Sequence, residues 1–272
     1  MRFGGVASGI CGAVLCVLLI GCRQEAPSPE ATGLIVEEVH TGGSAGQPDV
    51  DDFTVSRKFS HMPDHDVADF AGLAIIAYYR APSGALRDRA VILCEAFHGE
   101  ATVSDLILKG VGKDKQVVTL WPVKTSALEK RLESTETLSP TQICQEAVDG
   151  YDWLEGSAAI RDAAGFYAAR GKADVADRLL DGDQDGPWLL AWAPGADKGR
   201  TDDDVLVMTL DLSGADTPLK AERVFQAWRI AVERNPHLWS SQTVVNENWT
   251  TAFVRFVNLI GGDLNFYKRF FE

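Results

Sequence analysis

Residues 188–193 read WLLAWA, and this stretch decides the fold class. Side chains of an extended strand alternate between its two faces. The two Trp and Leu190 would therefore lie on one face, with Leu189 and the two Ala on the other. Both faces are apolar, so both must be covered, which predicts a sheet between two layers of helices.

Three further apolar runs have the length of a strand. They are residues 72–79 (GLAIIAYY), 116–123 (QVVTLWPV) and 204–212 (DVLVMTLDL). None of them alternates cleanly between polar and apolar residues, so they belong to the same kind of doubly covered sheet.

Apolar residues at helical spacing lie between and after these runs. One such stripe follows Ser83, and two others begin at the start signals Ser139-Pro140 and Thr217-Pro218, the second ending near Asn235-Pro236. Residues 157–180 are rich in Ala and Arg and are expected to be helical with a break near Gly171. A last stripe ends at Gly261-Gly262. Its members are Trp249, Phe253, Phe256, Val257 and Ile260.

The predicted elements follow the order β α β α α β β α α. The first crossover should make its two strands parallel, and the short connection over residues 194–203 suits an antiparallel pair. We therefore predict an α/β fold in a single domain, with a mixed sheet of four or slightly more strands and helices on both faces.

Composition excludes several classes of protein. The 272 residues hold 26 Lys and Arg against 39 Asp and Glu, a net charge of −13, which disfavours binding to nucleic acid. With 46% apolar and 24% charged residues, the chain is neither disordered nor a membrane protein throughout.

The first segment has the features of an export signal. Arg2 is followed by an uncharged stretch over residues 3–21, which ends in Leu19-Ile20-Gly21-Cys22. This string resembles the lipobox of bacterial prolipoproteins. The resemblance implies cleavage after Gly21 and lipidation of Cys22. An uncleaved transmembrane helix is the alternative, since the apolar run is near spanning length.

Three parts of the chain follow from this resemblance. Residues 1–21 are the signal peptide, residues 22–52 form a flexible tether rich in Pro, Gly and acidic residues, and residues 53–272 form the globular domain. The lipid anchor on Cys22 would hold the protein on a membrane of the bacterial cell envelope. Because Arg23 follows the lipidated residue, the resemblance favours the periplasmic face of the outer membrane, with the inner membrane as the alternative.

Two cysteines remain in the globular domain, because Cys11 and Cys16 leave with the signal peptide. Cys94 and Cys144 each lie on the apolar stripe of a predicted helix. An exported protein folds in an oxidising compartment, so we predict a Cys94–Cys144 disulfide. The alternatives are two free buried thiols, or a catalytic Cys94 with His98 four residues on.

Motifs for metals and phosphate are incomplete. Asp181, Asp183 and Asp185 match the opening of a calcium loop, but its twelfth position is Trp192 in place of Glu. A cluster near the first strand contains His61 and His65, separated by Pro63. Its remaining members are Asp64 and Asp66. We read both segments as polar loops, and expect no metal and no cofactor. Residues 110–114 (GVGKD) lack the spacing of a phosphate loop.

Ser44 lies in a G-x-S-x-G string, which is typical of serine hydrolases. Pro48 follows it and no helix can begin there, so we do not expect Ser44 to be a nucleophile.

Because no catalytic motif lies in a suitable context, the function we expect is that of a non-enzymatic binding or assembly protein, with a possible protein partner in the envelope. The alternative is an envelope hydrolase with a carboxylate site at the strand ends, for which Glu95, Asp152 and Asp211 are candidates. Five of the seven Trp lie on apolar stripes or strands and are expected in the core, with a sugar-binding cleft as the alternative. They are Trp121, Trp188, Trp192, Trp228 and Trp249. An exposed aromatic tail over residues 265–272 would mark a contact site.

Overall fold

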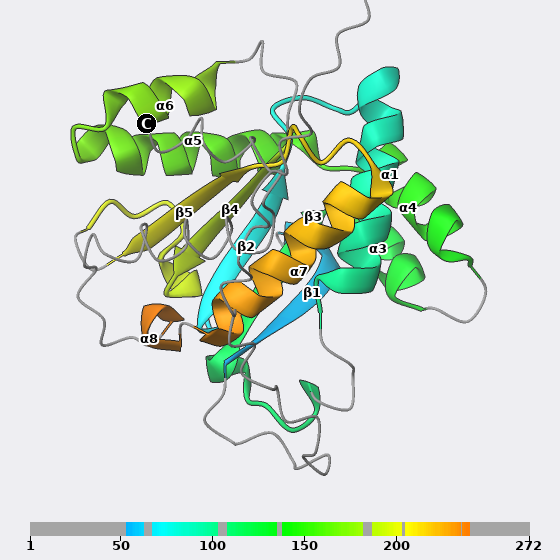
Figure 1. The fold of residues 1–272 in the computed structure, drawn as a ribbon, viewed down its shortest axis with the longest axis horizontal. Coiled ribbons are helices and arrows are strands. Elements are labelled where there is room, and N and C mark those ends of the chain that lie inside the picture. The colour runs from blue at the N-terminus through cyan, green and yellow to red at the C-terminus, as the bar shows by residue number, and fades with distance from the viewer. Residues whose placement is uncertain are drawn as a thin grey trace, which may run out of the picture. The chain divides into compact units, whose positions relative to one another are not determined.

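Five strands form one mixed sheet in the order β1-β3-β2-β4-β5 (Figure 1). In this computed structural model, β1 and β2 run parallel to β3, whereas β4 is antiparallel to both β2 and β5. The strands are β1 (Thr54–Ser60), β2 (Gly72–Ala77), β3 (Gln116–Pro122), β4 (Trp188–Ala193) and β5 (Leu206–Asp211). The predicted mixed sheet, the parallel first crossover and the antiparallel β4–β5 pair are confirmed.

The structure describes residues 53–62, 67–102, 108–134, 138–181, 187–202, 205–234 and 236–239, which belong to one compact unit. The signal peptide, Cys22, the tether and the last predicted stripe lie outside these residues. No helix of the described ranges is long and apolar enough to cross a membrane.

Helices cover both faces of the sheet, as predicted. Helices α1, α4 and α7 contribute to one hydrophobic cluster, and α5 and α6 contribute to the other, on the opposite face. The helices are α1 (Ala85–Glu100), α3 (Ser126–Glu133), α4 (Pro140–Asp149), α5 (Trp153–Ala169), α6 (Ala173–Leu180), α7 (Pro218–Arg234) and α8 (Pro236–Trp239), with short 3-10 turns η2 (Lys113–Lys115) and η3 (Gly195–Asp197).

Strand β4 joins the two clusters. Leu189 and both Ala side chains belong to the α1–α4–α7 cluster, whereas Leu190 and both Trp side chains belong to the α5–α6 cluster. All six side chains are at most 5% exposed. Both faces of the WLLAWA strand are therefore buried, as its sequence predicts.

Three helix boundaries that the sequence predicts are confirmed, and each has the local cap or break that predicted it. Ser139 and Gln142 form a reciprocal capping box at the start of α4, followed by Pro140. The hydroxyl of Thr217 accepts a hydrogen bond from the Lys220 N–H at the start of α7. Residues 157–180 are divided between α5 and α6 at Gly171, whose φ of 71° favours glycine.

Strand β1 was not among the four predicted runs. Its sequence, TVSRKFS, carries Arg57 and Lys58 at its centre, which hides the strand from an apolar pattern. The strand lies at the edge of the sheet, so these long side chains can reach around it. Lys58 pairs with Glu129 of α3 at 2.9 Å, and Arg57 donates to the carbonyl of His98.

Helix α3 closes part of the free edge of β1. Glu133 accepts a hydrogen bond from the N–H of Phe59 at 2.7 Å, and Glu129 accepts one from the N–H of His61 at 2.8 Å. Unpaired N–H groups on an edge strand would otherwise attract another strand. The two carboxylates occupy alternate positions along the edge and block that pairing.

We predict that Glu133→Ala lowers the free energy of unfolding by about 1–3 kcal/mol, because it leaves the N–H of Phe59 without its acceptor. Glu133→Gln keeps an acceptor and should cost less. Urea titration of both variants measures the difference, with the exposed Glu222→Ala as a control that changes stability by at most about 0.5 kcal/mol. Equal losses in the Ala and Gln variants would contradict the edge-capping role.

The same residue predicts a dependence on pH. Burial raises the pKa of Glu133, although the hydrogen bond from Phe59 opposes this. A carboxyl whose pKa is higher in the folded than in the unfolded state favours folding as the pH falls. The wild type should therefore gain stability relative to Glu133→Gln between pH 7 and the ordinary carboxyl pKa of about 4.3. Urea midpoints of both proteins across this range measure the effect, and a constant difference would contradict it.

Candidate functional site

The carboxyl ends of β1, β3, β2 and β5 lie at one edge of the sheet, because these four strands run in the same direction (Figure 1). Ligands of open α/β sheets usually bind at this edge. The segments found here are the connection from β2 to α1, the start of α5, and the connection from β5 to α7.

Tyr151 joins two of these segments. Its hydroxyl accepts a hydrogen bond from the N–H of Tyr78 at 3.0 Å and donates one to the carbonyl of Ile76 at 2.9 Å. Burial raises the pKa of both tyrosines. A Cβ atom on Gly156 would lie 2.2 Å from the Tyr151 hydroxyl and 2.9 Å from the Tyr78 carbonyl. Glycine at position 156 therefore lets α5 approach the end of β2.

The three carboxylates predicted as hydrolase candidates have separate partners. Asp152 accepts hydrogen bonds from two N–H groups at the start of α5 and so caps that helix. Glu95 accepts a hydrogen bond from the Thr141 hydroxyl at 2.7 Å, which connects α1 to α4. Asp211, at the end of β5, accepts one from the N–H of Ser213 at 2.7 Å. The structure thus gives each a local role and does not bring them together.

Asp211 is the most buried of the three, with 9% of its surface exposed. Burial raises its pKa, against the Ser213 hydrogen bonds and the guanidinium of Arg89, which lower it. Arg89 of α1 donates to the carbonyl of Ser213 and so holds the β5–α7 connection against α1. In the described ranges, no second carboxylate shares a hydrogen bond with Asp211.

Four exposed apolar side chains belong to segments at this same edge. Tyr79 follows β2, Trp153 and Leu154 begin α5, and Leu219 lies in the first turn of α7; they are 38%, 39%, 60% and 56% exposed. We call these four residues the carboxyl rim. Of the other large apolar side chains in the described ranges, Leu180 at the end of α6 is the one that is also exposed.

Two of the charged groups beside the carboxyl rim form ion pairs within the protein. Arg87 makes two hydrogen bonds to Asp149, at 2.7 and 2.9 Å, and Lys220 pairs with Asp216 at 2.7 Å. These two ion pairs satisfy part of the charge at this edge. Exposed apolar residues of this size are candidates for an interaction site.

The tryptophans divide between the core and the carboxyl rim. Trp153 belongs to the rim, and the other described tryptophans are at most 4% exposed. Those buried residues are Trp121, Trp188, Trp192, Trp228 and Trp239. Core packing is therefore confirmed for the four of them that the sequence places on stripes or strands, and Trp249 lies outside the described residues. The sequence did not identify Trp153, because its position directly after an N-cap residue carries no apolar pattern.

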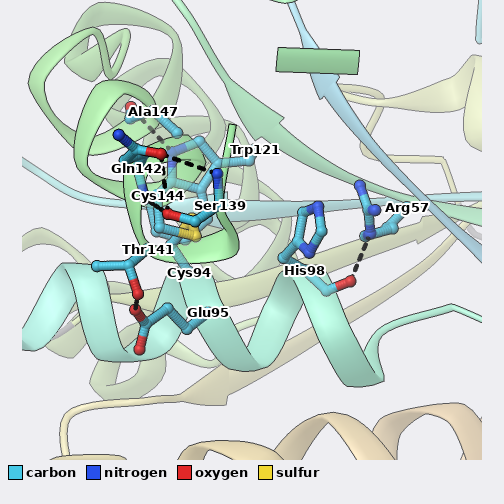
Figure 2. The surroundings of a disulfide bond; sticks show 10 residues. All are labelled: Arg57, Cys94, Glu95, His98, Trp121, Ser139, Thr141, Gln142, Cys144 and Ala147. Carbon is cyan, nitrogen blue, oxygen red and sulfur yellow. Dashed lines mark hydrogen bonds between the residues drawn. A yellow bond between two sulfur atoms is a disulfide. The ribbon is translucent and has the colours of Figure 1, made fainter. Parts of the chain in front are cut away.

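A disulfide joins Cys94 of α1 to Cys144 of α4, as predicted (Figure 2). The two Cα atoms are 5.5 Å apart and both side chains are fully buried. The alternatives of free thiols or a catalytic Cys94 are therefore wrong for this structure. The disulfide connects the two helices directly over the cluster that contains Trp121.

His98, one turn after Cys94, packs against the core, and no described contact of its ring would activate a thiol. Its ring stacks on Phe59 with the ring centroids 6.2 Å apart. Burial, and then the positive charge of Arg57, lower the pKa of His98 to about 4. The ring is therefore neutral near pH 7, and it contacts the core instead of the bonded Cys94 sulfur (Figure 2).

The described residues contain no group of three or more His, Cys, Asp or Glu that could hold a metal ion. Near the first strand, the backbone N–H of His61 binds Glu129, and its Nδ1 lies 3.3 Å from the carbonyl of Val123. Asp64, His65 and Asp66 lie outside the described ranges, as do Asp183 and Asp185. Trp192, at the twelfth position of the calcium-like string, is fully buried in β4.

Together, the fold and the carboxyl rim define an α/β domain with a mixed five-stranded sheet, a buried interhelical disulfide and an apolar surface at its carboxyl edge. Comparisons of the chain with protein-family models, curated proteins and solved structures gave no match.

We predict that replacing both cysteines, as Cys94→Ala with Cys144→Ala, lowers the free energy of unfolding by about 4 kcal/mol, the loop-closure value for a separation of 50 residues. Urea titration measures this loss. Alkylation under denaturing conditions provides the second readout: the oxidised wild type should show no reactive thiol at either position before reduction and two afterwards. Equal labelling with and without reductant would contradict the disulfide.

Proposed function

We propose that this protein is a lipid-anchored binding protein of the bacterial cell envelope, which contacts another envelope protein through the carboxyl rim. The observation that carries the binding function is the exposure of Tyr79, Trp153, Leu154 and Leu219 at the edge where α/β sheets hold their ligands. Arg87 and Lys220 beside them are paired internally with Asp149 and Asp216, and an apolar protein surface would suit the four exposed apolar side chains.

Two features support a place in the envelope. The string Leu19-Ile20-Gly21-Cys22 follows an uncharged stretch, as in bacterial prolipoproteins. The Cys94–Cys144 disulfide fits a protein that folds in an oxidising compartment. The proposed location is the periplasmic face of the outer membrane, with the domain connected to its lipid by residues 22–52.

The hydrolase alternative has weaker support. Asp152 caps α5 and Glu95 binds Thr141, so two of its three candidate carboxylates have structural roles. Asp211 is buried at the end of β5 with a raised pKa, as acid–base residues often are. Glycoside hydrolysis by carboxylates uses two of them, about 5–9.5 Å apart. Of the three candidates, Asp211 is the one whose described contacts leave this role to it, so the alternative depends on a second carboxylate that the sequence did not identify.

Lipidation can be tested at Cys22. In a bacterial host fed an alkyne-labelled fatty acid, the wild type should carry the label and begin at Cys22 when analysed by mass spectrometry. Cys22→Ala should carry no label and retain residues 1–21, because both processing steps need the thiol. Cys16→Ala is the matched control and should behave like the wild type. An unlabelled wild type that retains residues 1–21 would support the transmembrane alternative instead.

Binding through the carboxyl rim can be tested by photo-crosslinking in intact cells. A photoreactive residue at position 79 or 153 should capture the same protein, whereas one at the exposed Asp174 of α6 should not. Leu154→Asp should reduce the capture at least about five-fold, since it places a charge in an apolar contact. Far-UV circular dichroism checks that this variant folds. Equal capture from position 174, or capture unaffected by Leu154→Asp, would contradict the proposal.

A further inference from the structure

Part of one apolar face of the sheet, over β4 and β5, is buried although the described helices on that side pack mainly on β1 and on one another. On the α7 side of β4 and β5, side chains that belong to the larger hydrophobic cluster are at most 7% exposed. They are Leu189, Ala191, Met208 and Leu210. We call this surface the β4–β5 face.

The described helices are placed elsewhere. Helix α5 packs closely on both β4 and β5, but from the opposite face. On the α7 side, α7 packs against α1 and β1, and α1 packs against α4. In Figure 1, α7 crosses in front of the middle of the sheet, and no labelled helix lies in front of β4 and β5. Since a sheet face as apolar as this one must be covered, the helical layer on this side lacks a member.

We propose that residues 249–260 of this chain supply that member, as a helix that lies on the β4–β5 face. Five of their large apolar residues are spaced as on one side of a helix. These residues are Trp249, Phe253, Phe256, Val257 and Ile260. A helix of this length spans about 18 Å, and a strand of six residues spans about 20 Å. The stripe therefore matches β4 and β5 in both length and polarity.

The position of α8 brings this segment to the correct end of the face. Trp239, the last residue of α8, is buried against Trp228 and lies beside Gly72, where a Cβ atom would be 2.9 Å from its ring. Gly72 begins β2, and the next residue pairs with Trp192 near the end of β4. The chain after residue 239 thus starts beside the amino end of the sheet, next to β4.

The other long part of the chain is less suited to this role. Residues before 53 enter the domain at β1, on the opposite edge of the sheet. Four strand spacings separate β1 from β5, which is about 19 Å. Nine residues, 240–248, connect α8 to the stripe, and α8 ends beside the start of β2, which is the neighbour of β4.

The first test is a photoreactive residue at Met208 in the full-length oxidised protein, with the crosslinked peptides identified by mass spectrometry. Capture of a peptide from residues 240–272 of the same chain is the expected result. The matched control is Thr209, which faces α5 through Tyr167 and should capture α5 instead. Capture at Met208 of residues before 53, of another protein, or of α7 alone would overturn the proposal.

A pair of substitutions provides the second test. Phe253→Asp places a charge on the apolar stripe, whereas Thr251→Asp places one on the opposite side of the same predicted helix. Hydrogen exchange of residues 206–211 should become at least about ten-fold faster in Phe253→Asp and remain unchanged in Thr251→Asp. Unchanged exchange in both variants, or equal acceleration in both, would contradict the assignment.

Discussion

The whole structure depends on covering a sheet that is apolar on both faces. Strand β4 shows this constraint most clearly, since all six of its side chains are buried, three on each face. Parallel strands β3 and β2 share this property, and none of them could face water. The helices on either side, the disulfide that joins α1 to α4, and the close approach of α5 at Gly156 all follow from the need to bring two apolar layers onto one sheet.

Polar side chains at the edges of the sheet bind backbone groups and so hold the surrounding segments in place. At the edge of β1, the carboxylates of Glu129 and Glu133 bind backbone N–H groups that have no neighbouring strand. At the carboxyl edge, Asp152, Tyr151 and Asp211 bind the backbone of the segments that leave the sheet. These groups are occupied in holding the fold, and the exposed rings and leucines of the carboxyl rim are the surface through which we propose that the domain contacts a partner.

The sequence predicted the elements whose patterns are local. WLLAWA, the cap at Ser139-Pro140 and the break at Gly171 each depend on a few neighbouring residues, and the structure retains them. Strand β1 was missed because its central Lys58 and Arg57 are bound by Glu129 of α3 and the carbonyl of His98 in α1, distant partners that no local pattern reveals. The Cys94–Cys144 pair was predictable because two cysteines remained on buried stripes. The exposure of Trp153 was not, since it depends on where the start of α5 lies relative to β2.

The most direct test of this account is native-state hydrogen exchange along the sheet. If β2 and β4 are covered on both faces, amides of residues 72–77 and 188–193 should exchange only through global unfolding, with protection that falls in parallel with stability as urea is added. Amides of α6 should exchange earlier, by local opening. Exchange of β4 at rates that are independent of urea and similar to those of α6 would show that one face of this strand is open to water, and would contradict the account.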